Sequence, residues 1–114
     1  MSECVFCKIV GGSIVSPRVY ENGGVIVIND ANPVSRVHAL IITKKHIKDV
    51  MSVGADDAGL LRDIQDAVLE TAKIKGVDAT GFRLVTNCGE DGGQSVPHLH
   101  YHIVGGRKLG EKIV

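Results

Sequence analysis

The sequence predicts an α+β fold with a mainly antiparallel sheet of five strands, one long helix and one short N-terminal helix. Short apolar, β-branched runs lie toward both ends of the chain, and a single long amphipathic stretch lies between them. That order favours an antiparallel sheet over alternating βαβ units. The length of 114 residues suits one compact domain, residues 1–114, which can bury a core without disulfides.

The first half of the chain predicts a short helix and three strands. Residues 4–10, CVFCKIV, form an apolar segment of one or two helical turns that ends at a pair of glycines. Residues 18–22 and 25–30 are typical of two strands, because Gly23-Gly24 supplies the positive φ of a tight turn between them. Residues 38–44, HALIITK, predict a third strand.

The second half predicts the long helix and two more strands. Residues 56–76 carry two aspartates at the start, lysines at the end and a terminating Gly76. Their apolar face repeats at 3.6-residue spacing, through Leu60, Leu61, Ile64, Ala67, Val68, Thr71 and Ala72. Residues 82–87 predict a strand, residues 88–97 a glycine-rich loop, and residues 98–104 a final strand.

The final predicted strand carries three of the five histidines, at every second position: His98, His100 and His102. Alternate residues of a strand point to one face, so the three histidines share a face. The Cα atoms of neighbouring histidines lie about 6.5–7 Å apart, and those of the outer pair about 13–14 Å. Zinc ligands lie only about 2.0–2.1 Å from the metal, so the three cannot bind one ion and must have different roles.

The glycine-rich loop before the histidines indicates an anion site. Such loops bring backbone N–H groups together, which is how proteins hold phosphate. Ser95 adds a hydroxyl and Asn87 an amide. Imidazoles beside an anion site favour phosphoryl or nucleotidyl chemistry, and the alternative is a solvated polar face of the sheet.

The composition argues against several other classes of protein. A net charge of +0 and a pI near 7.0 argue against a broad grip on DNA or RNA. No apolar run approaches the ~20 residues that span a bilayer. The chain starts without the basic-then-apolar pattern of a signal peptide and has an odd number of cysteines, three, so we expect a reducing, cytoplasmic compartment.

Residues 98–104, HLHYHIV, match the pattern His-φ-His-φ-His-φ-φ, with φ apolar, of the histidine triad (HIT) superfamily. The longer stretch DGGQSVPHLHYHIVGGR resembles the nucleotide-binding branch that acts as purine nucleoside phosphoramidases. CVFCKIV, IND and HALIITKKHI resemble further family segments in the same order. The resemblance implies a HIT-like fold. It also implies a homodimer in which the long helix and a sheet edge pair across a twofold axis into one continuous sheet.

The resemblance implies a role for each residue of a catalytic group. His100 would be the nucleophile, attacking the α-phosphorus of a purine nucleoside 5′-phosphoramidate. The covalent nucleotidyl-histidine would then be hydrolysed to release AMP or GMP. His102 would steady the phosphate charge, and Ser95 would assist the leaving nitrogen. Asn87 and the backbone at Gly93 would hold phosphate oxygens.

The resemblance also implies a nucleoside site and a supporting histidine. Asp30 would accept hydrogen bonds from ribose hydroxyls, and the alternative is a strand-ending turn residue, which DANP would also suit. His38 would support the nucleophile region, or it is simply a strand-end surface histidine. The base would lie in an apolar cleft whose predicted lining is equally consistent with simple core packing: Phe6, Ile9, Ile28 and Leu40.

Cys4 and Cys7 form a C-x-x-C pair, a spacing at which two thiolates can bind one zinc ion. The resemblance adds His46 and His98, which would complete a closed tetrahedral zinc site with a structural role. Free thiols or a redox pair are the alternatives, although a thioredoxin-like βαβ context is missing. Cys88 borders the phosphate loop, as an inert or a reactive thiol.

Two other functions remain open. His100 could also serve as the nucleophile in the hydrolysis of dinucleoside polyphosphates. The sequences GGQS and GGR fit the branch of the superfamily with that activity less well. A zinc-stabilised nucleotide-binding module with little turnover would need nearly the same residues. The chain departs from the phosphoramidase branch after Arg107, where the tail KLGEKIV lacks the family's tryptophan and proline residues. That tail shapes the leaving-group side in the family, so the leaving group is left open.

Overall fold

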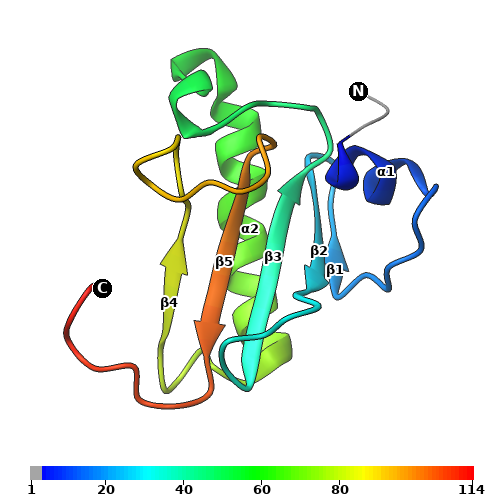
Figure 1. Ribbon diagram of the computed structural model, residues 1–114. Helices are drawn as coiled ribbons and strands as arrows, with labels where there is room; N and C mark the ends of the chain where they lie inside the picture. Colours follow the sequence, from blue (N-terminus) through cyan, green and yellow to red (C-terminus); the bar gives the residue numbers. More distant parts are fainter. Residues whose placement is uncertain (1–3) are drawn as a thin grey trace.

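A computed structural model describes residues 4–114, which form one five-stranded antiparallel sheet with a long helix behind it (Figure 1). The strand order is β1-β2-β3-β5-β4, so the two central strands are β3 and β5. The elements in chain order are α1 (Val5–Gly11), β1 (Tyr20–Glu21), β2 (Val25–Asn29), β3 (Val37–Thr43), the 3-10 turns η1 (Val50–Ser52) and η2 (Ala55–Asp57), α2 (Ala58–Lys75), β4 (Phe82–Val85) and β5 (His100–Gly105).

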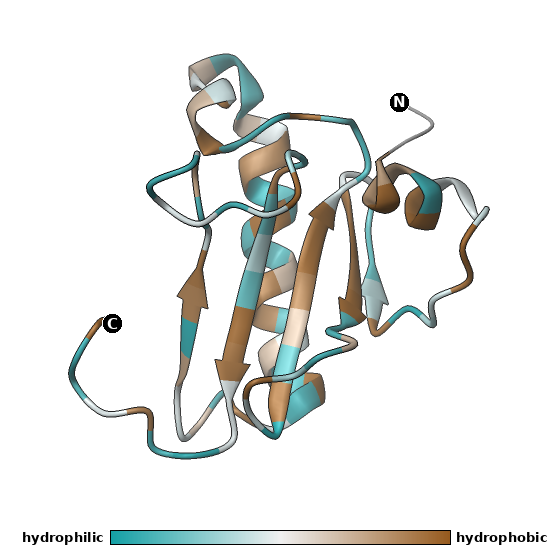
Figure 2. Ribbon diagram, in the orientation of Figure 1, coloured by the Kyte–Doolittle hydropathy of each residue, from teal (hydrophilic) through white to brown (hydrophobic). Residues whose placement is uncertain are grey.

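Helices lie on both faces of the sheet. Helix α2 lies along one face, and the short helix α1 lies near β1 and β2 on the other (Figure 1). Strand β3 is buried at all seven positions and is hydrophobic almost throughout, whereas β5 begins hydrophilic (Figure 2). His100 and His102 therefore lie on β5, directly beside the apolar central strand β3.

The core facing α2 is built from the alternate residues of the strands. The buried cluster on this side comprises Val25, Val27, Ala39, Ile41, Ile64, Ala67, Val68 and Ile103. Tyr101 packs against it from β5. Burial raises the pKa of the Tyr101 phenol, so this ring stays neutral on the helix side of the sheet. Burying apolar surface of this kind is the main favourable term in folding.

The register of β3 and β5 sets the surroundings of the histidines. His100 lies opposite Ile42, and His102 lies opposite Leu40. The next strand continues the two rows, since Ile26 pairs with Ile42 and Ile28 with Leu40. Each histidine thus has an aliphatic neighbour on the adjacent strand, and the histidine face is apolar around the triad.

The fold class predicted from the sequence is confirmed. The helix predicted at 56–76 is α2, and its first two residues lie in η2 instead. Leu61 departs from the predicted apolar face, because it is 44% exposed while most of that face is buried. The two 3-10 turns were not predicted from the sequence.

The final strand begins two residues later than predicted. Strand β5 starts at His100, and His98 lies in the bend before it, although Thr43 N–H still donates to the Leu99 carbonyl at 3.4 Å. Leu99 N–H donates instead to Ile47 O at 2.6 Å, which draws this segment to the loop after β3. The first triad histidine is thereby free of the regular ladder.

Across residues 4–114, no helix combines the length and apolar character needed to cross a membrane. The expectation about the start of the chain concerns residues 1–3, which lie outside the described part.

Candidate functional site

His100 is held by the backbone in one orientation. Its ring is buried, and its Nδ1 lies 2.7 Å from the carbonyl oxygen of His98. A carbonyl oxygen can only accept, so Nδ1 carries the proton and the Nε2 lone pair is free. The backbone carbonyl of His100 is itself fixed by the Thr86 hydroxyl, which donates to it at 2.8 Å. The strand therefore fixes the proton on Nδ1 and leaves Nε2 as the ring nitrogen that can act as a nucleophile.

His102 and His38 form a second, linked pair. The Val34 N–H donates to His38 Nδ1 at 3.1 Å, so the His38 proton lies on Nε2. His38 Nε2 lies 2.9 Å from His102 Nδ1, and donation across that contact leaves His102 with its proton on Nε2. His102 thus becomes a donor at Nε2, which suits it to contact a phosphate oxygen. His38 is buried on β3 and is not a strand-end surface residue.

The charged form of His102 is disfavoured in the folded protein. Burial lowers the pKa of His102 below its usual 6.5, and the neighbouring His100 and His38 lower it further, against a smaller opposing effect of Asp30. The rings lie tilted to one another, with centroid distances of 5.2 Å for His100 with His102 and for His38 with His102. This crowding of imidazoles keeps His102 neutral near pH 7 and preserves its hydrogen-bonding pattern.

The loop between β4 and β5 is organised by Gln94, a residue that the sequence analysis did not single out. Its side-chain oxygen accepts from Gly89 N–H at 2.9 Å, and its amide nitrogen donates to Lys48 O and Val96 O. Gly92 must be a glycine, because a Cβ there would lie 2.4 Å from Cys88 O. The only sequence signal for Gln94 was its place between paired glycines and the triad.

The predicted phosphate-contacting groups lie in this loop but differ in availability. The Gly93 N–H donates to Glu90 O at 3.0 Å, so this amide is engaged within the loop. A Cβ on Gly93 would lie 3.8 Å from the Asn87 side-chain nitrogen, which places that amide beside the loop backbone. Ser95 is exposed to solvent. The side chains of Asn87 and Ser95 are therefore better placed to reach a ligand than the Gly93 amide.

Asp30 follows β2 and fills one of the two roles considered from the sequence, that of a strand-ending turn residue. One carboxylate oxygen accepts from Asn32 N–H at 2.8 Å, which is a strand-ending Asx turn. The other lies 3.3 Å from His38 Nε2, which ties Asp30 to the histidine pair. A carboxylate has about four lone-pair sites, so two of these remain for ligand hydroxyls.

The apolar residues predicted to line a base cleft lie together on the histidine face. Phe6, Ile9, Ile28 and Leu40 are buried in one cluster with Ile26 and Ile42. The Phe6 ring meets the His100 ring edge-on at a centroid distance of 4.8 Å and the His98 ring at 5.8 Å. The cluster forms an apolar wall directly beside the histidine that carries the free Nε2.

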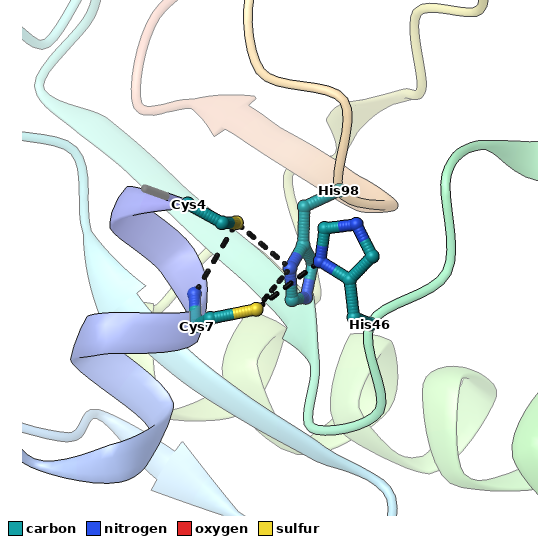
Figure 3. A group of neighbouring side chains, drawn as sticks. All are labelled: Cys4, Cys7, His46 and His98. Carbon is teal, nitrogen blue, oxygen red and sulfur yellow. Dashed lines mark hydrogen bonds between the residues drawn. The ribbon is translucent and has the colours of Figure 1, made fainter. Parts of the chain in front are cut away.

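Four further side chains converge at the other end of the triad (Figure 3). Cys4, Cys7, His46 and His98 place one potential ligand atom each within 4.8 Å of all the others. Cys4 Sγ lies 3.3 Å and Cys7 Sγ 3.6 Å from His98 Nδ1, and Cys7 Sγ lies 3.1 Å from His46 Nδ1. This group could hold a metal ion, and two sulfurs with two imidazole nitrogens suit tetrahedral coordination.

The ring of His98 has the tautomer that metal binding needs. Its Nε2 lies 2.7 Å from Thr43 O and must donate, which leaves the Nδ1 lone pair facing the two sulfurs. Burial lowers the pKa of His98. The hydrogen bond to the Thr43 carbonyl raises this pKa, and the charges of His46 and His100 lower it further. Burial also raises the pKa of the Cys7 thiol, and the Cys4 thiol adds to that effect. A bound cation would favour the thiolate forms, which burial otherwise disfavours.

A second group, Asp30, His38 and His102, also brings its ligand atoms within 4.8 Å of one another, but its tautomers oppose a metal. His38 Nε2 carries a proton, because Val34 N–H occupies Nδ1. A cation there would have to displace that proton and the hydrogen bond to His102. The group of Asp30, His38 and His102 is therefore suited to hydrogen bonding. The group of two cysteines and two histidines around His98 is the one suited to metal binding.

The chain resembles known proteins over most of its length. The profile of the family described as "Scavenger mRNA decapping enzyme C-term binding" matches residues 3–112. A HIT-like protein of Chlamydia muridarum is 41% identical over 106 residues, covering 93% of this chain and 83% of that protein. The protein HitA of Neisseria gonorrhoeae is 38% identical over 105 residues, covering 92% and 97%.

Solved structures show the same fold along the whole chain. A HIT family hydrolase from Clostridium thermocellum superposes with a TM-score of 0.95 at 45% identity, covering 100% of this chain and 99% of that one. A histidine triad protein from Clostridium difficile gives 0.92 at 44% identity, covering 98% and 97%. The fold and the alternating histidines thus define a histidine triad protein. This chain belongs to the HIT superfamily, as its sequence predicts.

We expect stability to fall as the pH falls through the range in which His102 titrates. The folded-state pKa of His102 is lowered, so the unfolded chain binds more protons below about pH 6.5. The free energy of unfolding should therefore be larger at about pH 7.5 than at about pH 5.5. Urea unfolding at both pH values would measure this difference, which should be smaller for His102→Asn than for the wild type. An unchanged difference would contradict the lowered pKa of His102 as its cause.

Proposed function

We propose that this protein is a hydrolase that cleaves purine nucleoside 5′-phosphoramidates through a nucleotidyl-His100 intermediate and releases AMP or GMP. The observation that carries the proposal is the hydrogen bond from His100 Nδ1 to the His98 carbonyl, which leaves Nε2 as a free nucleophile. Neighbours of this fold described as HIT family hydrolases support hydrolysis as the reaction class.

In the first step the His100 Nε2 lone pair attacks the α-phosphorus, and the bond from phosphorus to the leaving nitrogen breaks. The leaving amine takes a proton, for which the Ser95 hydroxyl is the proposed donor. His102 Nε2–H and the Asn87 amide hold the phosphate oxygens as negative charge grows on them. The chain supplies neutral donors there, because the pKa of His102 is lowered.

In the second step water attacks the phosphorus and displaces His100 as a neutral imidazole. The released nucleotide keeps its phosphate, and the proton from water returns to the group that protonated the amine. The nucleoside end is proposed to lie with its ribose at Asp30 and its base against Phe6, Ile9, Ile28 and Leu40. The contact of Phe6 with the His100 ring supports this placement, because it puts the apolar wall beside the reacting nitrogen.

We expect His100→Ala to lower the turnover of adenosine 5′-phosphoramidate by about a thousandfold or more, since the covalent step is lost. AMP binding should be largely kept, because the groups proposed to bind the nucleoside are unchanged. Calorimetry with AMP and a chromatographic assay of AMP release would give both quantities. Wild-type protein quenched in alkali, where the phosphorus–nitrogen bond is stable, should carry one nucleotidyl group on the peptide that contains His100.

The same experiment separates the alternatives. Equal turnover in wild type and His100→Ala would overturn the nucleophile assignment. AMP binding without turnover in either protein would favour a nucleotide-binding module. Faster cleavage of a dinucleoside polyphosphate than of the phosphoramidate would favour a dinucleoside polyphosphate hydrolase.

We also propose that the metal held by Cys4, Cys7, His46 and His98 is zinc with a structural role. All four ligand positions are filled by side chains, which is typical of structural zinc sites. The three cysteines are free, and thiolates that hold zinc must stay reduced. A reducing, cytoplasmic compartment is therefore part of the same proposal.

We expect the purified protein to contain about one zinc ion per chain, measured by plasma mass spectrometry after dialysis. Cys7→Ser should lose most of the zinc, because one of two sulfur ligands is removed. Cys88→Ser is the matched control and should retain it. Zinc-free wild-type protein after expression with added zinc would refute the proposal.

We propose that a homodimer forms along β4, one of the two edge strands of the sheet. Strand β4 pairs only with β5, so its outer edge is open among residues 4–114. Leu84 on β4 is 42% exposed and lies opposite Ile103, which belongs to the core facing α2. A second copy paired along β4 would close this edge, cover Leu84 and continue the sheet.

Light scattering on a sizing column should give twice the chain mass for the wild-type protein. Leu84→Glu should shift the protein toward the monomer, because it places a charge in the proposed contact. Ile113→Glu is the control, since Ile113 is 87% exposed in the tail. A monomeric wild-type protein would rule the dimer out.

A further inference from the structure

The ring of His38 has one proton and two acceptors within reach of it. Its Nδ1 accepts from Val34 N–H at 3.1 Å, so the proton lies on Nε2. That Nε2 lies 2.9 Å from His102 Nδ1 and 3.3 Å from Asp30 Oδ2. The first distance lies within the usual range of about 2.7–3.2 Å for a hydrogen bond from nitrogen, and the second lies just beyond it. One N–H is therefore shared, with His102 as the nearer acceptor.

The backbone holds Asp30 and His38 in this arrangement. Asp30 N–H donates to His38 O at 2.9 Å, which continues the pairing of β2 with β3 by one residue. The other carboxylate oxygen, Oδ1, accepts from Asn32 N–H at 2.8 Å and fixes the plane of the carboxylate. The side chain of His38 is 5% exposed, and that of Asp30 is 21% exposed. A ligand therefore reaches the carboxylate more readily than the buried ring beside it.

The two acceptors differ in strength as well as in distance. A hydrogen bond to a carboxylate is roughly twice as strong as one between neutral groups, so Asp30 draws the His38 N–H away from the neutral ring of His102. Burial lowers the pKa of His102 most, and Asp30 raises it, so the charge of the carboxylate reaches this ring too. A hydroxyl that donates to Asp30 Oδ2 would satisfy part of the carboxylate's accepting capacity and weaken its pull on the shared N–H.

We propose that Asp30 and His38 are positioning residues that couple recognition of a ligand hydroxyl to the stabilisation of phosphate by His102. The inference rests on the function proposed above, in which the ribose lies at Asp30 and His102 Nε2–H contacts phosphate. When a ribose hydroxyl donates to Asp30, the His38 N–H turns to His102 Nδ1. A ring that accepts more strongly at one nitrogen donates more strongly at the other, because linked hydrogen bonds polarise one another. The site therefore selects ribonucleosides in the chemical step as well as in binding.

Nitrogen NMR spectra of the full chain with isotope-labelled histidine test this coupling without any turnover. Adenosine is the probe, because it carries the ribose hydroxyls and no phosphate. It should shift the signals of His38 Nε2 and His102 Nδ1, and 2′,3′-dideoxyadenosine should shift them less. Asp30→Asn keeps an oxygen for the Asn32 turn and places a donor nitrogen beside His38, so its signals should be shifted in the same direction without a ligand. The matched control Asp78→Asn removes the charge of an exposed aspartate and should behave as the wild type does.

Kinetics measures the effect of the coupling on the reaction. With the wild type, 2′,3′-dideoxyadenosine 5′-phosphoramidate should have a kcat about fivefold lower than adenosine 5′-phosphoramidate, besides any rise in KM. In Asp30→Asn the two substrates should have similar kcat values, and in Asp78→Asn the difference should remain. Histidine signals that adenosine leaves unchanged, or that dideoxyadenosine shifts equally, would overturn the coupling, as would a loss confined to KM. A wild type without turnover would refute the hydrolase alone, because the spectra still decide the coupling.

Discussion

The chemistry of the site depends on hydrogen bonds between the backbone and single ring nitrogens of the histidines. Thr43 O holds His98 Nε2, His98 O holds His100 Nδ1, and Val34 N–H holds His38 Nδ1. Each bond fixes where the ring carries its proton, and therefore what its other nitrogen can do. The same side chain is thereby suited to three different roles: the proposed metal ligand His98, the proposed nucleophile His100, and His38, which donates to His102.

These bonds follow from the pairing of β3 with β5. The register sets Leu40 against His102 and Ile42 against His100, and it brings His38 to the side of His102. A shift of one residue would turn the histidines toward α2 and Ile103 toward the opposite face, so the buried core on the α2 side enforces the arrangement of the histidines. The full burial of β3 is thus a requirement of the site as well as of stability.

The sequence predicted the fold class, the order of the strands' appearance and the face shared by the triad, because alternation and 3.6-residue spacing are local properties. It could not predict that His98 leaves the ladder, since that depends on Ile47 O capturing the Leu99 amide. The part played by Gln94 was equally hidden, because its partners at Gly89, Lys48 and Val96 are set by tertiary contacts. The convergence of Cys4, Cys7, His46 and His98 was expected from resemblance, and distances alone could establish it.

Helix α1 couples the two ends of the triad. Phe6 lies between Cys4 and Cys7 in the sequence, and its ring contacts both His98 and His100. Any bond that fixes the two sulfurs against His98 also fixes the turn that carries Phe6. The carbonyl that orients the His100 ring belongs to His98 as well. The candidate metal site and His100 are therefore linked through the Phe6 side chain and the His98 backbone, and displacing α1 would disturb the apolar wall and the support of His100 together.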